Sequence, residues 1–391
     1  MSRLIALLLL SAAPALADDT TTSRLIAAEG LSAAAAQLEA RAASPDRDMA
    51  LSAVRFLGGI EAAYQARWQM GATEPLLPLP VLGAALPSNP EPRAMRADDI
   101  NRMMQDLSLA MEETRQALPA GDGALVLDLA DLWLDVDADK RRSPQEGLAQ
   151  LAALPLPQGA TQLRFDAADM HWLRAYTHLI EGMATLILAF DPEPALAQKL
   201  ALDRALAAQF AEPPGQKARA PSLDMQARAL GPMVDRIAVL LQTLRQQPDP
   251  DLTRAAGDHL RAMVAANRNF WQVVAQEEDN DREWIPNDRQ QAALGFELAP
   301  GTGSLWLDIL YEVDEALAGR MLIPFWRFAP GYGIDLQMWL DQPSPLDPVD
   351  WAQGSAALPY GRPGLTAGRD NWDRFLNLFG DRLVLYMMLL N

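Results

Sequence analysis

Apolar residues recur every three or four positions along most of the first 276 residues. Between Leu51 and Trp68, for example, Val54, Leu57 and Tyr64 fall on one face of a helix. The same spacing predicts further helices over roughly 20–43, 97–118, 124–134, 146–154, 167–190, 194–210, 222–246 and 251–276, joined by proline-rich breaks. Because no period holds over three units, as a repeat protein would need, the prediction is a mainly α fold built as an irregular multi-helix array.

The pattern changes after about residue 280, where tryptophan, proline and glycine become frequent. Residues 321–328 and 334–340 are predicted to form a short β-hairpin around the glycine-bearing turn 329–333, and residues 382–389 to form a third strand or a last helix. Tryptophans in such a region either pack in the core or line a groove for a sugar or peptide, and the core is the commoner place. The tryptophans concerned are Trp284, Trp306, Trp326, Trp339, Trp351 and Trp372.

The N-terminus has the sequence pattern of an export signal. Arg3 precedes the apolar run 4–10, and small residues end at Ala17, so residues 1–17 are predicted to be a signal peptide and the protein to be periplasmic or secreted. The alternative is an amphipathic start to the fold. After residue 17, the sequence predicts two regions: a helical region 18–211 and a helical and irregular region 222–391. A linker-like stretch rich in proline, glycine and charged residues separates them.

The composition excludes several classes of partner. A net charge of −18 repels phosphate backbones and anionic lipid, so nucleic acid is not expected as a partner, whereas cations are. The most apolar later segment, 383–390, is less than half the length of a membrane-spanning helix, so no integral membrane segment is expected. The absence of cysteine rules out disulfides and any thiol-linked anchor.

A twelve-residue loop carries the clearest chemistry. Oxygen-bearing side chains occupy its first, third, fifth, ninth and twelfth positions, and the seventh residue would supply its backbone carbonyl. The predicted ligands are Asp135, Asp137, Asp139, Arg141, Ser143 and Glu146. This loop resembles an EF-hand calcium loop, in which alternate oxygens surround one hard cation. Residues 125–134 and 144–154 would be the entering and exiting helices.

Two features depart from that resemblance. Lys140 stands at the sixth position, where EF-hands have glycine for a sharp turn, and Arg142 replaces the usual apolar eighth residue. The alternative interpretation is a helix start, because residues 143–146 form a capping box with proline at the first helical position. That alternative leaves three crowded aspartates unexplained, since their charges repel one another without a cation or solvent between them.

Two further groups of polar residues give weaker signals. His171 and His178 lie seven residues apart on one predicted helix, with Arg174 and Glu181 nearby, which indicates a buried polar network or the wall of a cleft. Two histidines so far apart on one helix cannot share a metal ion without help. The acidic run 277–283 fits a solvated loop, or the paired carboxylates of an enzyme that hydrolyses glycans.

The export signal, the helix 167–190, the loop 135–146 and the segment 351–360 together resemble exported, mostly helical bacterial proteins. The expected function is a non-catalytic, calcium-binding protein of structural or ligand-binding role, with an aromatic C-terminal surface for a protein or saccharide partner. The alternative is an exported hydrolase that acts on glycans through carboxylates in 277–283.

Overall fold

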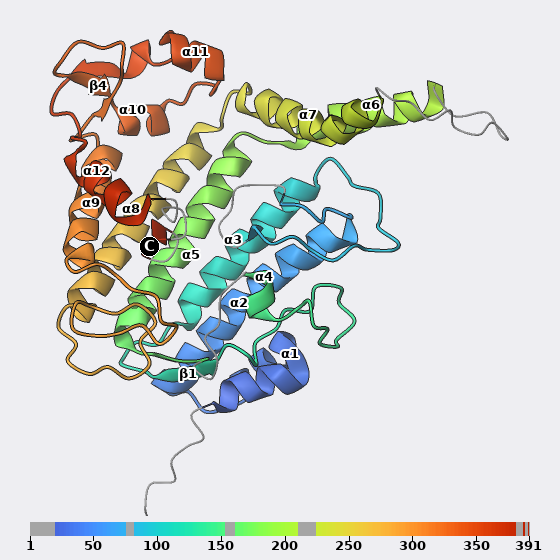
Figure 1. The fold of residues 1–391 in the computed structure, drawn as a ribbon. Coiled ribbons are helices and arrows are strands. Elements are labelled where there is room, and N and C mark those ends of the chain that lie inside the picture. The colour runs from blue at the N-terminus through green and yellow to red at the C-terminus, as the bar shows by residue number, and fades with distance from the viewer. Residues whose placement is uncertain are drawn as a thin grey trace, which may run out of the picture.

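The computed structural model describes residues 20–75, 82–152, 161–209, 224–380, 386, 387 and 390. Within these residues the chain is mainly helical, with twelve α-helices and two small antiparallel sheets (Figure 1). The predicted fold class is thereby confirmed. The predicted signal peptide 1–17, the linker and most of the segment 382–389 lie outside the described residues.

Two long helices, α5 (Ala167–Ala189) and α8 (Pro250–Val274), pack side by side at the centre of the molecule. Figure 1 shows α3 (Asp99–Ala117) and α2 (Pro45–Gln69) on one side of this pair and α9 (Thr302–Leu317) on the other. The remaining helices are α1 (Thr21–Glu39), α4 (Leu148–Leu151), α6 (Glu193–Gln209), α7 (Asp224–Leu244), α10 (Leu336–Asp341), α11 (Pro348–Gln353) and α12 (Asp370–Phe379). No helix in the described part of the chain has the length and apolar character needed to cross a membrane.

Capping residues fix where the central helices begin. The side chain of Ser44 accepts a hydrogen bond from the Arg47 amide at 3.2 Å, at the start of α2. Asp166 and Asp169 form a reciprocal capping box at the start of α5. Asp249 caps α8, whose first residue is a proline. These helices therefore begin within a few residues of where the sequence signals place them.

The core forms on both sides of α5. Tyr176 and Ile180 pack with α1, α2 and α3, whereas Ala175 packs with α8 and α9 around Phe270. Burial on two sides explains why the sequence of α5 is apolar around much of its circumference. α5 therefore lies between the core that it shares with α1, α2 and α3 and the core that it shares with α8 and α9.

The predicted helix 124–134 is wrong. Residues Leu125–Asp128 form β1, which pairs antiparallel with β2 (Gln162–Phe165). Because three consecutive apolar residues of β1 are all buried, the segment lacks the alternation that distinguishes a half-exposed strand from a helix. Within residues 146–152, the described part of the predicted helix 146–154, only the four-residue α4 forms.

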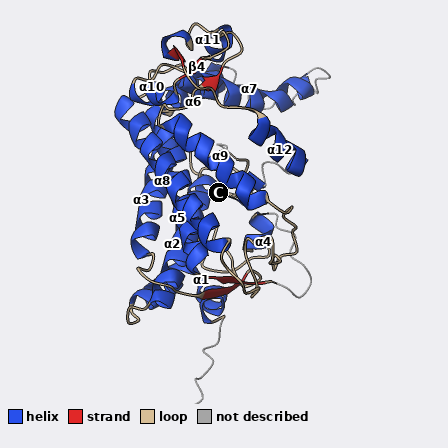
Figure 2. Ribbon diagram, turned by 90° about the vertical axis from the view of Figure 1, so that its left-hand side faces the viewer, coloured by secondary structure: helices blue, strands red, loops and turns tan. Residues whose placement is uncertain are grey.

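The predicted C-terminal hairpin is present but short. Strands β3 (Ile323–Pro324) and β4 (Tyr332–Ile334) pair antiparallel, and β5 (Gly361–Pro363) adds a third strand. Figure 2 shows this sheet and the β1–β2 sheet at opposite ends of the helical layer. The second predicted strand, 334–340, is wrong beyond residue 334, because α10 begins at Leu336. The Asp335 side chain caps this helix start by accepting from the Met338 amide at 3.1 Å.

The late tryptophans are divided between the core and the surface. Trp306 and Trp339 are buried in the core beside α8 and α9. Trp326 is instead 72% exposed, and the guanidinium of Arg327 lies 4.1 Å from its ring centroid. The core interpretation of these tryptophans therefore holds for some positions and not for all.

Candidate metal centres

The loop 135–146 is closed at its base by backbone pairing. The Leu134 amide donates to the Glu146 carbonyl at 2.9 Å, and Trp133 pairs with Gly147 in an isolated bridge. The Trp133 indole in turn donates to the Ile26 carbonyl of α1 at 2.7 Å. The flanking pair of helices predicted by the EF-hand resemblance is absent, because β1 precedes the loop and only α4 follows it.

Aspartate side chains shape the first half of the loop. The carboxylates of Asp135, Asp137 and Asp139 accept hydrogen bonds from the amides of residues 140, 139 and 141 at 3.1, 3.1 and 2.7 Å. These bonds curl the backbone into successive turns, as short acidic side chains commonly do. Lys140 adopts a left-handed conformation with φ of 62°, so the loop makes its sharp turn at the sixth position without glycine.

Glu146 reaches back across the loop from its last position. It is only 1% exposed, and its two carboxylate oxygens accept from the amides of Val136 at 2.9 Å and Ser143 at 2.8 Å. The bond from Ser143 is one half of the capping box that the alternative interpretation requires. However, the next helix begins only at Leu148, with Gly147 as its N-cap, so Glu146 does not lie in the first turn of a helix.

Three of the six predicted ligands converge. One carboxylate oxygen each from Asp135, Asp137 and Glu146 lies within 4.8 Å of the others. Calcium binds oxygen at about 2.3–2.6 Å, so two ligands of one ion are at most about 5 Å apart, and the three oxygens can share one ion. The Oδ1 atom of Asp135 is buried and has no hydrogen-bond partner among the described residues. Asp139 lies outside this group, and Arg141 is exposed at the surface of the loop.

A fourth carboxylate, which the sequence analysis missed, comes from α2. Glu61 accepts from the Asp135 amide at 2.7 Å, and burial together with the nearby charges of Asp135 and Glu146 raises the pKa of Glu61 to about 7. Burial and the neighbouring carboxylates also raise the pKa values of Asp135 and Asp137. Negative charge is therefore crowded here, which a bound cation would relieve.

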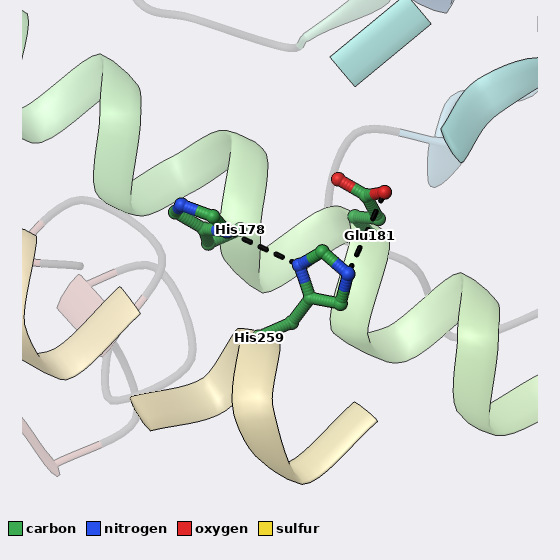
Figure 3. Close-up of side chains that lie close together, drawn as sticks. All are labelled: His178, Glu181 and His259. Carbon is green, nitrogen blue, oxygen red and sulfur yellow. Dashed lines mark hydrogen bonds and ion pairs between the residues drawn. The ribbon is translucent and has the colours of Figure 1, made fainter. Parts of the chain in front are cut away.

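A second group of ligand-bearing side chains lies where α5 and α8 pack (Figure 3). The Nδ1 atoms of His178 and His259 are 3.1 Å apart, and His259 Nε2 lies 3.5 Å from Glu181 Oε1. Arg115 of α3 pairs with the other carboxylate oxygen of Glu181. The sequence pattern indicated His171 and His178 of one helix, but not His259, which is 81 residues from His178 and carries no local signal.

Both imidazoles of this second group are held in the neutral form. Burial, with the positive charge of Arg115, lowers the pKa of His178 to about 4. Burial also lowers the pKa of His259, although the charge of Glu181 opposes this effect. At neutral pH each ring therefore keeps one nitrogen lone pair, which it can offer to a proton or to a metal ion.

The acidic run 277–283 lies in the loop after α8 and is partly paired. Asp281 contacts Arg282 at 3.0 Å and Arg164 at 3.6 Å. Glu283 is buried and accepts from the Asp281 amide at 2.8 Å. Burial, and then the charges of Glu277 and other nearby acids, raise the pKa of Glu283 to about 7. The hydrolase alternative, which needs two carboxylates across a sugar, stays a prediction.

The raised pKa of Glu283 predicts a pH effect on stability. Its folded-state pKa of about 7 exceeds the usual 4.5, so its contribution to stability is full below pH 4.5 and is lost as pH rises through about 7. Glu283→Gln keeps an acceptor for the Asp281 amide but cannot ionise. Relative to the wild type, it is expected to gain stability between about pH 4.5 and pH 7, by at most about 3 kcal/mol. Urea unfolding at several pH values measures this difference.

Glu278→Gln provides the matched control, because Glu278 lies in the same run but is exposed. Its stability difference from the wild type is expected to stay constant with pH. If the difference for Glu283→Gln were equally constant, the carboxyl of Glu283 would not be protonated in the folded state at neutral pH.

Comparisons of the chain with protein-family models, with curated protein sequences and with solved structures found no match.

Proposed function

We propose that this is an exported, non-catalytic protein in which the loop 135–146 binds one calcium ion as a structural brace. The observation that carries the proposal is the convergence of the Asp135, Asp137 and Glu146 carboxylates within 4.8 Å, with one buried aspartate oxygen that accepts no hydrogen bond from the described residues. A buried polar atom without a partner is costly, and a cation satisfies both that atom and the crowded charge.

Calcium suits this site better than a transition metal, because the available ligands are all oxygens. Calcium takes six to eight of them, so the proposal needs further ligands besides the three carboxylates. Asp139, the Arg141 carbonyl and Ser143 hold the sequence positions that supply them in the EF-hand pattern. A single site with these departures is expected to bind weakly, with a dissociation constant of about 10⁻⁴ to 10⁻³ M as in extracellular modules.

The position of the loop explains how an ion there would brace the fold. Asp135 contacts α2 twice, since its amide donates to Glu61 and its carbonyl accepts from Gln65 at 2.7 Å. Trp133, next to the loop, is bonded to α1. An ion that held the loop in one conformation would therefore stabilise its contacts with α1 and α2, which join residues about 70 to 107 positions apart in sequence.

The C-terminal region offers a surface for a partner, which we propose to be a protein or a saccharide. Trp326 is 72% exposed and Tyr332 is 48% exposed, and both belong to the hairpin region. Exposed aromatic rings contribute apolar area with little loss of side-chain freedom on binding, and they stack on sugars or pack against peptides.

Calcium titration by calorimetry, together with thermal melting in calcium and in chelator, tests the brace. Because a ligand that binds only the folded state raises its stability, calcium is expected to produce a binding isotherm and a higher melting temperature. Asp135→Asn is expected to weaken both effects, whereas Asp122→Asn, at an exposed position before β1, is expected to change neither. No heat of binding and an unchanged melting temperature for the wild type would overturn the proposal.

A further inference from the structure

The packing of α5 against α8 brings one histidine from each helix into contact. His178 and Glu181 lie one helical turn apart on α5, so both face α8. Gly182 lets the two helices approach closely, since a Cβ atom at this position would be only 3.2 Å from the Cβ of His259. The arrangement of these three side chains therefore rests on two rigid helices and not on a loop.

The spacing of the ligand atoms suits a small cation. Zinc binds imidazole nitrogen at about 2.0–2.1 Å, which places two nitrogens of a tetrahedral site about 3.3 Å apart. The two Nδ1 atoms, at 3.1 Å, are already close to this separation. Without an ion, the Nδ1–H of one neutral ring donates to the Nδ1 of the other. An ion bound between these two atoms takes the place of that hydrogen, whose proton then resides on the Nε2 atom of the same ring. One oxygen of Glu181 lies within 4.8 Å of both rings.

We propose that His178, Glu181 and His259 form a binding site for a first-row transition-metal ion such as Zn²⁺. Two imidazoles and one carboxylate are ligands that zinc uses when a fourth position is left for water or another ligand. Glu181 is 12% exposed and His259 is 23% exposed at the side chain, so solvent reaches the site and can fill that position. Calcium, which prefers oxygen, is expected to bind poorly here.

The charged groups around the site permit a cation. Arg115 and Arg174 bring positive charge toward the histidines, and Glu181, Glu112 and Asp258 bring negative charge. Arg261 also pairs with Asp258 at 3.5 Å, so three carboxylates lie near three guanidinium groups, and no net positive charge opposes an ion. Arg115 pairs with one oxygen of Glu181, which orients the carboxylate. The other oxygen, Oε1, lies 3.5 Å from His259 Nε2, so a turn of the Glu181 side chain or of the His259 ring is needed to bring all three ligands to an ion between the Nδ1 atoms.

Zinc titration of the calcium-saturated protein tests the proposal. The wild type is expected to bind one Zn²⁺, and Co²⁺ in its place is expected to give the visible absorption bands of a site with nitrogen ligands. His178→Ala and His259→Ala are each expected to weaken zinc binding at least tenfold, because even the loss of a group that only supports a ligand weakens metal sites by about 10–100-fold. Glu181→Gln is expected to weaken binding as well.

His171→Ala is the matched control, because it removes the remaining histidine, which lies on the same helix but outside the group. It is expected to bind zinc as the wild type does, and circular dichroism confirms that each variant is folded. Asp135→Asn is expected to keep zinc binding, which separates this site from the calcium loop. The proposal is overturned if the wild type binds no zinc, or if His171→Ala weakens binding as much as His259→Ala does; a variant that fails to fold is replaced by His178→Asn or His259→Asn.

Discussion

Arg67→Met is expected to lower the free energy of unfolding by about 2–4 kcal/mol, measured by urea denaturation. Arg67 lies on α2 and is 1% exposed, and its guanidinium donates to the carbonyls of Leu82, Ala84 and Thr73 at 2.8, 3.0 and 3.1 Å. Methionine fills a similar volume but donates no hydrogen bond, so three carbonyls lose their partner. Each unsatisfied buried acceptor costs about 1–3 kcal/mol, partly offset because a charge no longer has to be buried.

Arg55→Met is the control for this change, because Arg55 lies on the same helix with a side chain that is 29% exposed and paired with Glu39 at the surface. Loss of this surface ion pair is expected to lower the free energy of unfolding by less than about 1 kcal/mol. Arg67→Lys is expected to fall between the two, since one ammonium cannot reproduce the forked contact to three carbonyls. Equal stability of Arg67→Met and Arg55→Met would show that the bonds from Arg67 do not hold the segment after α2 in place.

The contribution of Arg67 also shows where sequence reasoning about the fold succeeds and where it fails. The periodicity and the caps of α2, α5 and α8 are local signals, and the observed helices follow them closely. The proline-rich stretch after α2 carries no such signal, and its path at Leu82 and Ala84 depends on bonds to one distant arginine. Sequence patterns describe segments, whereas this contact joins residues that are 15 to 17 positions apart with no periodic relation.

The errors in the C-terminal region have a related cause. The segment 302–317 has apolar residues at helical spacing, among them Leu305, Ile309 and Leu310, and it forms α9. The frequent tryptophan, proline and glycine around it are typical of irregular structure, so the prediction from the sequence contains no helix there. The prediction of a helix at β1 was wrong for a different reason. A short strand that is buried on both faces has the same run of apolar residues as a buried helical turn, so the sequence pattern cannot distinguish the two.

The two candidate metal centres differ in how far the sequence predicts them. The loop 135–146 is contiguous, so spacing alone identified the carboxylates that converge in the structure. Glu61, which adds a fourth carboxylate to the loop, comes from α2, and its approach depends on how α2 packs. His259 reaches His178 only because α5 and α8 pack closely at Gly182. Ligands brought together by tertiary packing leave no trace in the spacing of one sequence.

Glu146→Gln is expected to abolish most of the stabilisation of the protein by calcium. At a calcium concentration 100 times the dissociation constant, binding to the folded state alone is worth about 2.7 kcal/mol, and removing one charged ligand is expected to eliminate most of this increment. The variant is also expected to be less stable by about 1–2 kcal/mol without calcium, because the amide accepts through one oxygen where the carboxylate accepts from both Val136 and Ser143.

Asp137→Asn separates the two roles of the loop carboxylates. The asparagine oxygen can still accept from the Asp139 amide, so the fold of the loop and the stability in chelator are expected to stay close to those of the wild type. Its reduced charge is nevertheless expected to weaken calcium binding, and the calcium-dependent rise in melting temperature should shrink with it. If Glu146→Gln were less stable in chelator but both variants kept the full calcium increment, Glu146 would act only as a hydrogen-bonding brace of the backbone. In that case the crowded carboxylates of the loop would have to be relieved by protonation and solvent, because no ion would hold them together.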